Sequence, residues 1–243
     1  MNQLETHNLV KRFDGVHAVD HLSIVIKPAQ ITGIIGPNGS GKTTLTNLLS
    51  GFLPMDAGAI HLGDLKLSRV RPYDIATYGI TRTFQDVRLF EQMTVLDNIL
   101  VVLTERNVWS ALFEKHTHFH LTRAEEVLTR VGLWEKRNEM AKGLSYGQRK
   151  LLEIARVLAM NAQIYLFDEP FAGLFPEMVK IVVGILKELR DQGKTVVLIE
   201  HNMALIRELS DTVIVMDAGK LLAQGKPEEV LSRRDVIEAY LGE

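Results

Sequence analysis

The chain has 243 residues, of which 46% are hydrophobic and 24% charged, which is enough apolar material for one large domain or two lobes. The formal net charge of -2 disfavours a general nucleic-acid-binding protein, and the absence of cysteine excludes disulfides, thiolate metal sites and thiol catalysis. Residues Met1–Arg12 lack the apolar segment of a secretory signal, and no stretch approaches the roughly 18 apolar residues that cross a bilayer. We therefore expect any membrane role to pass through a partner.

The first part of the chain predicts a strand, a glycine-rich loop and a helix in direct succession. Ala18–Ile26 ends in alternating apolar residues, and Gln30–Ile35 is a short apolar run that leads into the glycine-rich turn. Lys42–Ser50 then places leucines on one face, as a helix does. A strand, a glycine-rich loop and a helix in this order are the context in which a phosphate-binding loop has its meaning.

The middle of the chain changes character and predicts a helical lobe. Val95–Leu103 reads as a helix behind a capping Thr94, and Leu121–Leu133 reads as a second helix. Between them, the polar and aromatic insert Arg106–Leu121 carries three alternate histidines: His116, His118 and His120. Histidines could hold a metal, but at alternate positions in a polar insert we expect them to be solvated.

The strand pattern returns in the last third of the chain. The predicted strands are Ile164–Phe167, Thr195–Ile199 and Thr212–Met216, with helical segments between them and a short helix over Arg233–Tyr240. Strands that alternate with helices predict parallel βαβ units and an α/β fold.

Eight consecutive residues fit the phosphate-loop pattern G-x-x-x-x-G-K-[ST]: Gly36, Pro37, Asn38, Gly39, Ser40, Gly41, Lys42 and Thr43. Glycines let backbone N–H groups turn inward around phosphate oxygens, and the start of a helix adds positive potential. We expect Lys42 to contact the β- and γ-phosphates, Thr43 to give its hydroxyl to Mg²⁺, and Thr44 to lie in the nucleotide site. A plain glycine-rich turn with an exposed lysine is the alternative, which the flanking strand and helix disfavour.

A second motif is an apolar strand that ends in two carboxylates, Asp168 and Glu169. At the carboxyl end of a strand, Asp168 is expected to hold Mg²⁺ through water, and Glu169 to orient or polarise the attacking water. Alone, this pattern could be an acidic turn; beside a phosphate loop it predicts a nucleotidase.

The pentapeptide Leu144–Gln148 (LSYGQ) precedes a predicted helix, Arg149–Met160. Ser145 could cap that helix, Gly147 keeps its backbone accessible, and the helix start is a second anion site. A plain helix cap is the alternative for this segment on its own.

With these motifs in this order, the chain resembles the ABC ATPase family over essentially its whole length. LSYGQ is similar to the family signature LSGGQ, and LFDEP to its acidic strand. The resemblance further implies that Phe13 stacks on adenine, that Gln85 meets the metal site and the transmembrane partner, and that His201 contacts the γ-phosphate. It also implies that Ser145, Gly147 and Gln148 cover the ATP held by a second chain, in a head-to-tail dimer. Taken singly, Phe13 could be a core residue, Gln85 a solvated amide and His201 a hydrogen-bonded residue at a helix start.

The resemblance implies a fold and a division into lobes. The expected fold is a P-loop nucleotidase core with a mainly parallel sheet, an N-terminal antiparallel β-subdomain and a helical signature subdomain. We expect one ABC ATPase domain over residues 1–243, with a core lobe of 1–84 and 161–243 and a helical lobe of 85–160. The implied cofactors are ATP and Mg²⁺.

The segment Arg82–Gln85, the residues that follow it, Tyr146 and the ending AYLGE look like the branched-chain amino acid importer ATPases. Such importers use two ATPases, and this chain is similar to the one with an insert before the signature. The resemblance implies permease subunits, a second ATPase subunit and an extracytoplasmic binding protein as partners, with no nucleic acid. We expect a cytoplasmic location, peripheral on the inner face of the membrane.

One residue departs from the family pattern. Phe175 stands where the family usually has Asp or Asn, and its ring cannot make the side-chain hydrogen bond that helps to connect the two composite sites. Urea or amide import, lipopolysaccharide export, a soluble ABC ATPase, a regulatory nucleotide-binding module and a small-molecule kinase are the alternative functions. The last two leave Glu169, His201 or LSYGQ without a role.

Overall fold

The computed structural model describes residues 3–83, 87–103 and 118–241. Its contacts divide the chain into two units. Unit 1 comprises residues 1–82, 163–169 and 185–243, and unit 2 comprises residues 83–162 and 170–184. Each unit is described by itself. The predicted boundaries of the core and helical lobes stay a prediction.

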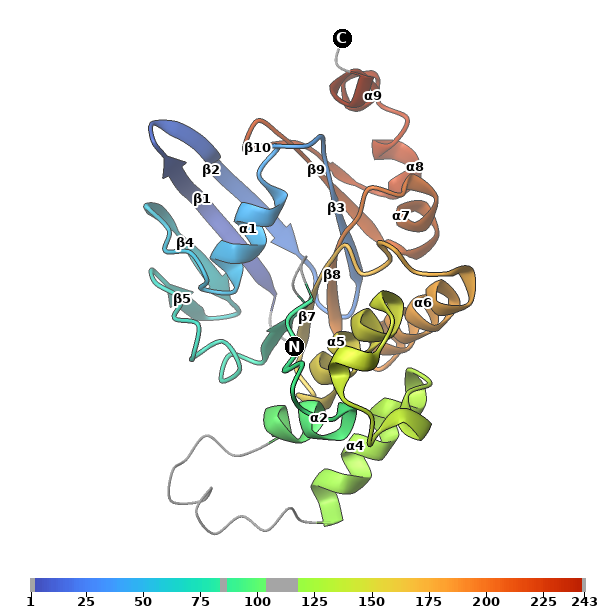
Figure 1. Ribbon diagram of the computed structural model, residues 1–243. Coiled ribbons are helices and arrows are strands. Elements are labelled where there is room, and N and C mark those ends of the chain that lie inside the picture. Colours follow the sequence, from blue (N-terminus) through green and yellow to red (C-terminus); the bar gives the residue numbers. More distant parts are fainter. Residues whose placement is uncertain (1–2, 84–86, 104–117, 242–243) are drawn as a thin grey trace. The chain divides into compact units, whose positions relative to one another are not determined.

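Unit 1 contains an antiparallel sheet of four strands in the order β2-β1-β4-β5 (Figure 1). The strands are β1 Leu4–Phe13, β2 Val16–Ile26, β4 Ala57–Leu62 and β5 Leu65–Leu67. β1 and β2 form a hairpin because Asp14 and Gly15 both adopt positive φ, the conformation that a two-residue turn needs. One face of this sheet is apolar and buried, while the other carries polar side chains.

The second sheet of unit 1 has six strands in the order β10-β9-β3-β8-β7-β6. Its strands are β3 Ile31–Ile35, β6 Ile80–Arg82, β7 Ile164–Asp168, β8 Thr195–Ile199, β9 Thr212–Asp217 and β10 Lys220–Gly225. All pairs are parallel except β9 with β10, and the central strands β3, β7 and β8 are buried along their whole length. Since parallel strands end at one edge, the loops after β3, β7 and β8 meet there.

Helix α1 (Lys42–Leu49) lies between the two sheets of unit 1, as Figure 1 shows. Leu45, Leu48 and Leu49 of α1 share one buried core with Leu9 of the first sheet and Ile34 of the second. The other helices of unit 1 are α7 Met203–Leu209, α8 Pro227–Val230 and α9 Arg234–Leu241. The core therefore fixes the start of α1, which is where the phosphate loop ends.

Unit 2 is helical in the part that the structure describes. Its elements are α2 Val95–Leu103, α4 His118–Arg130, the short helices η1 Trp134–Lys136 and η2 Ala141–Gly143, and α5 Tyr146–Ala159. Helix α6 (Pro176–Asp191) begins in unit 2 and ends in unit 1. Within the described residues, no helix is both long and apolar enough to cross a membrane.

The fold agrees with the predicted α/β class. Strands β3, β7, β8 and β9 and helices α1, α2 and α5 lie where the sequence predicts them, within a few residues. The predicted helix Leu121–Leu133 is three residues late at both ends: α4 spans His118–Arg130, so His118 and His120 are helical.

Candidate nucleotide site

The loop between β3 and α1 can be built only from glycine at two points. Gly36 and Gly41 both have positive φ. A Cβ atom on Gly36 would collide with the backbone oxygen of Met216, and one on Gly41 with the backbone oxygen of Ala18. The close approach of these strands to the loop therefore holds its backbone in a curve that presents N–H groups. Asn38 and Gly39 are exposed at its rim, while Ser40 is buried.

Lys42 lies inside this loop. Its Nζ donates to the backbone oxygens of Gly36 at 2.8 Å and Pro37 at 2.9 Å, and to Oγ of Ser40 at 3.4 Å. Only 6% of Lys42 is exposed, and burial lowers the pKa of its ammonium, an effect opposed by the carboxylates of Glu169 and Asp168. The loop thus surrounds a buried donor with oxygen acceptors, and the end of β7 adds two carboxylates that interact with it.

The two residues after Lys42 differ in exposure. Thr43 is exposed at the first turn of α1, and Thr44 is half-buried. The dipole and the free N–H groups of this helix start add positive potential at the same place.

Asp168 is the last residue of β7 and is buried, with only 1% of its surface exposed. Its Oδ2 lies 3.5 Å from Oγ1 of Thr46 on α1 and 3.7 Å from Nη2 of Arg82 on β6. Arg82 also donates to Oδ1 of Asn47 and Oγ of Ser50, so it ties β6, β7 and α1 together. Sequence reasoning missed the role of Arg82, since nothing in its local pattern shows that it meets a carboxylate 86 positions away.

Glu169 and His201 face each other at the ends of β7 and β8. His201 Nε2 lies 3.2 Å from Oε1 of Glu169. Glu169 has a φ of 48° without being glycine, and its backbone N–H donates to the oxygen of Ile199 at 3.0 Å. Such a conformation is costly for a residue other than glycine, and it occurs where the Glu169 carboxylate meets His201.

The turn after β8 is organised by two further residues that sequence reasoning missed. Glu200 is buried, and its Oε2 accepts from the backbone N–H of His201 at 3.1 Å. Asn202 caps α7 by accepting from the N–H groups of Ala204 and Leu205. Both fix the backbone on either side of His201. A sequence signal existed for Asn202, a typical capping residue before a helix.

Phe13 lies at the end of β1 beside the hairpin turn. Its ring is 43% exposed, and Nζ of Lys11 lies 5.4 Å from the ring centroid. The alternative that Phe13 is a core residue is thus disfavoured, and an accessible aromatic face remains.

Near the carboxyl end of the described chain, Tyr240 of α9 places its hydroxyl beside Gly36. Burial raises the pKa of Tyr240 to about 12, and the backbone N–H of Gly36 acts in the opposite direction. The sequence did not predict that α9 lies close to the first residue of the phosphate loop.

The signature residues lie in unit 2. Ser145 caps α5, and its Oγ accepts from the backbone N–H of Gln148 at 3.3 Å, while Oε1 of Gln148 accepts from the N–H of Ser145 at 3.0 Å. This reciprocal pair is a capping box. A Cβ on Gly147 would lie 2.7 Å from Sδ of Met178, so glycine lets α6 approach the start of α5.

The structure thus brings the phosphate loop, Asp168, Glu169 and His201 together in unit 1, and Ser145, Gly147 and Gln148 together in unit 2. Gln85 and His116 lie outside the described residues. His118 and His120 are on α4, where Nδ1 of His118 lies 3.2 Å from Oγ1 of Thr122. In the described part of the chain these two histidines belong to no cluster of potential metal ligands.

Comparisons with known proteins identify the family of the chain. Residues 19–172 match the family model described as ABC transporter, and residues 220–243 match the one described as Branched-chain amino acid ATP-binding cassette transporter. The chain is 41% identical, over 99% of its length and 98% of the relative's, to the high-affinity branched-chain amino acid transport ATP-binding protein LivG of Escherichia coli K12.

Solved structures of ATP-binding cassettes share the fold over nearly the whole chain. A nucleotide-free ATP-binding cassette from an ABC transporter superposes with a TM-score of 0.88 at 34% identity, and the match covers 100% of both chains. A dimeric ATP-binding cassette in a post-hydrolysis state, bound to ADP and Pi, superposes with a TM-score of 0.81 at 25% identity, covering 92% of this chain and 98% of that one.

Proposed function

The chain belongs to the ATP-binding subunits of ABC transporters, and we propose that it hydrolyses Mg-ATP to power the import of branched-chain amino acids. The activity is ATP hydrolysis, as in the family. The cargo is that named for LivG, which the chain matches over almost its whole length. The observation that carries the proposal is the meeting of Lys42, Asp168, Glu169 and His201 at one edge of one sheet.

The residues present fit a magnesium nucleotide. Gly36 and Gly41 let the loop backbone curve against its neighbours, Lys42 offers an ammonium, and Thr43 and Asp168 offer hard oxygen ligands. Thr43, Asp168 and Gln85 would hold Mg²⁺, which when bound neutralises charge on the phosphate oxygens. Phe13 would stack on the adenine, and the loop N–H groups with those of Thr43 and Thr44 would bind the phosphates.

The chemical step follows from the Glu169–His201 contact. Glu169 is a carboxylate positioned to accept a proton from the attacking water, and His201 Nε2 at 3.2 Å can hold that carboxylate in place or donate to the γ-phosphate. His201 can take either role, because 41% of its side chain is exposed to solvent.

A second chain completes the site. Ser145, Gly147 and Gln148 of a partner subunit would cover the γ-phosphate, so that ATP closes the dimer and hydrolysis reopens it. The dimeric relative with ADP and Pi supports this arrangement. The further partners are two permease subunits at the inner face of the membrane, reached through Gln85 and unit 2, and indirectly an extracytoplasmic binding protein. The second ATPase is a copy of this chain or a different subunit.

The test is steady-state ATP hydrolysis by wild type and Glu169→Gln, with size-exclusion chromatography in Mg-ATP. We expect slow turnover in wild type, and in the variant at least about a hundredfold less turnover with an ATP-stabilised dimer, because a general base contributes about 10²–10⁴-fold. Glu177→Gln, on α6, is the matched control and should leave turnover unchanged. Normal turnover in Glu169→Gln would refute the role of Glu169.

A further inference from the structure

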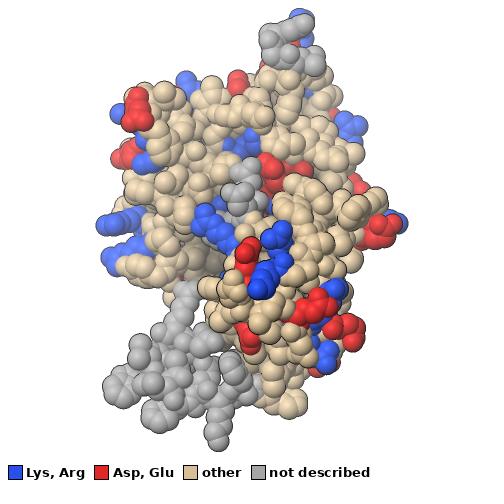
Figure 2. Space-filling model, in the orientation of Figure 1, with Lys and Arg blue, Asp and Glu red and all other residues tan. Residues whose placement is uncertain are grey.

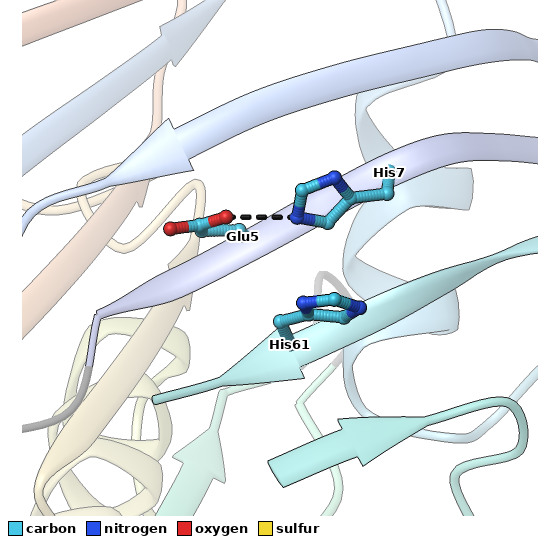
Figure 3. Close-up of side chains that lie close together, drawn as sticks. All are labelled: Glu5, His7 and His61. Carbon is cyan, nitrogen blue, oxygen red and sulfur yellow. Dashed lines mark hydrogen bonds and ion pairs between the residues drawn. The ribbon is translucent and has the colours of Figure 1, made fainter. Parts of the chain in front are cut away.

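A cluster of three potential metal ligands lies on the polar face of the antiparallel sheet of unit 1. Glu5 and His7 are two positions apart on β1, so both point to the side opposite the buried Leu4 and Thr6. His61 on β4 lies directly across from Glu5 in the strand register. Figure 3 shows the three side chains converging from these two neighbouring strands.

His7 already contacts both of the other side chains. Nε2 of His7 lies 2.8 Å from Oε2 of Glu5, and the rings of His7 and His61 have centroids 4.2 Å apart. One ligand atom of each of the three residues lies within 4.8 Å of the other two. The other oxygen of Glu5 accepts from Nε2 of Gln3 at 2.7 Å, which holds the carboxylate toward the histidines.

We propose that Glu5, His7 and His61 bind a divalent transition metal of the zinc class. Two imidazoles and one carboxylate are a ligand set that suits Zn²⁺, with solvent completing the coordination. With metal–ligand distances of about 2.0–2.1 Å, tetrahedral ligands lie roughly 3.3 Å apart. The 2.8 Å pair must therefore open slightly and His61 must turn inward, and the partial exposure of all three side chains permits both movements.

Two features of the cluster separate it from the nucleotide site. It shares no residue with the phosphate loop, Asp168, Glu169 or His201, and imidazole is a poor ligand for Mg²⁺, which prefers oxygen. Excess Mg²⁺ should thus leave it vacant for zinc. Because β1 and β4 each supply ligands, the bound metal would cross-link the two strands and stabilise the β-subdomain.

A second group of histidines on the same sheet provides a comparison. His17 and His21 both approach Oδ1 of Asp20, but Oδ2 of Asp20 lies 3.2 Å from Nζ of Lys220. An ammonium on the carboxylate repels a metal cation. Within the described residues, Glu5, His7 and His61 are the one group of three His, Asp or Glu side chains whose ligand atoms come within reach of a single ion.

The experiment is a calorimetric titration of the purified chain with Zn²⁺ at neutral pH and excess Mg²⁺, with thermal melts in the same buffers. We expect one zinc per chain and a melting temperature that rises with zinc. His61→Gln and Glu5→Gln should each weaken binding by at least about tenfold, because a ligand contributes no less than the outer-shell groups, whose loss costs 10–100-fold. The His17→Gln/His21→Gln double variant is the matched control and should bind like wild type.

The contrary results are equally definite. Absence of zinc binding by wild type, or equal binding by His61→Gln, would overturn the proposal. So would binding that disappears in a His118→Gln/His120→Gln variant instead. Melts without metal show whether each variant is folded. ATP hydrolysis in zinc-free buffer should be equal in wild type and His61→Gln, so failure of this proposal is distinguishable from failure of the proposed function.

Discussion

The ammonium of Lys42 is the most tightly held charge of the phosphate loop, since three loop oxygens surround it. We expect Lys42→Ala to weaken ATP binding by at least about tenfold, because a charge-assisted contact to phosphate contributes about 1.5–3 kcal/mol. Equilibrium binding of a fluorescent ATP analogue measures this. Lys27→Ala, which removes an exposed lysine of unit 1, should bind as wild type does. Unchanged affinity in Lys42→Ala would refute the phosphate-loop assignment.

At this scale the sequence predicts residues that belong to contiguous motifs. The loop, the acidic pair and LSYGQ are each fixed by neighbours in the chain, so their positions can be read without a structure. Arg82 and Tyr240 could not be, because their partners are distant in sequence and only the fold brings them together. The same holds for Glu5, His7 and His61, which become one group only through the register of β1 with β4. Glu200 instead contacts its own chain neighbours, His201 and Asn202. Gln85 keeps its predicted role as a prediction.

Ser145 caps helix α5, so its substitution affects both a single residue and the helix that it begins. Ser145→Ala removes the acceptor for the N–H of Gln148 and should cost about 1 kcal/mol of stability, measured by urea unfolding. It should also lower turnover, because the hydroxyl is proposed to face the γ-phosphate in the partner's site. Ser145→Asn retains a capping side chain, so it should restore stability without restoring turnover. Full recovery of turnover in Ser145→Asn would mean that Ser145 is a cap and nothing more.

Asp56 joins β1 to the segment before β4. Nζ of Lys11 donates to Oδ1 of Asp56 at 2.8 Å, and the backbone N–H of Arg12 donates to its Oδ2 at 2.7 Å. These hydrogen bonds hold the pKa of the Asp56 carboxyl below its usual value, and the one from Lys11 has the largest effect. Because the pKa of Asp56 is lower in the folded than in the unfolded chain, its carboxylate stabilises the fold at a pH above the unfolded pKa of about 3.9. This contribution is lost as the pH falls through the pKa of the folded state.

The stability lost in Asp56→Asn should accordingly be greatest near neutral pH and should shrink as the pH falls below about 4. Urea unfolding of wild type and variant across this range measures it. Asp64→Asn, at an exposed turn position between β4 and β5, is the control. A difference that stays constant with pH would contradict the proposed contribution of the carboxylate.

Elements with one dominant period were predicted well, and irregular ones were not. The apolar runs of β3, β7 and β8 are strands buried on both faces, which local sequence identifies. β1 was not predicted, because its pairing with β2 shifts register three times and Asn8 has a positive φ. Apolar and polar residues therefore do not alternate regularly along its sequence. β4 and β5 are short and polar on one face. The early start of α4 could not be read because histidine and phenylalanine are weak helix formers.

At the scale of the whole molecule, the confirmed prediction is the family. The order of the phosphate loop, LSYGQ, the acidic strand and His201 is what an ABC ATPase requires, and the relatives bear it out. Opposite charges are interspersed over the face drawn in Figure 2, in keeping with the near-zero net charge. Surface charge thus gives little guidance to the partners.

We propose that communication between the two composite sites of a dimer is altered by Phe175, which is 69% exposed and stands where the family usually has Asp or Asn. If a polar side chain at this position links the composite sites, Phe175→Asp should raise the Hill coefficient for ATP toward 2, the number of sites, with little change in maximal turnover. Phe119→Asp is a close control, because Phe119 is 70% exposed on α4 of the same unit. Turnover as a function of ATP concentration in the assembled transporter decides. Since an exposed phenylalanine contributes little to the core of one chain, destabilisation cannot imitate the effect. Equal Hill coefficients in wild type and Phe175→Asp would mean that the sites communicate through other contacts.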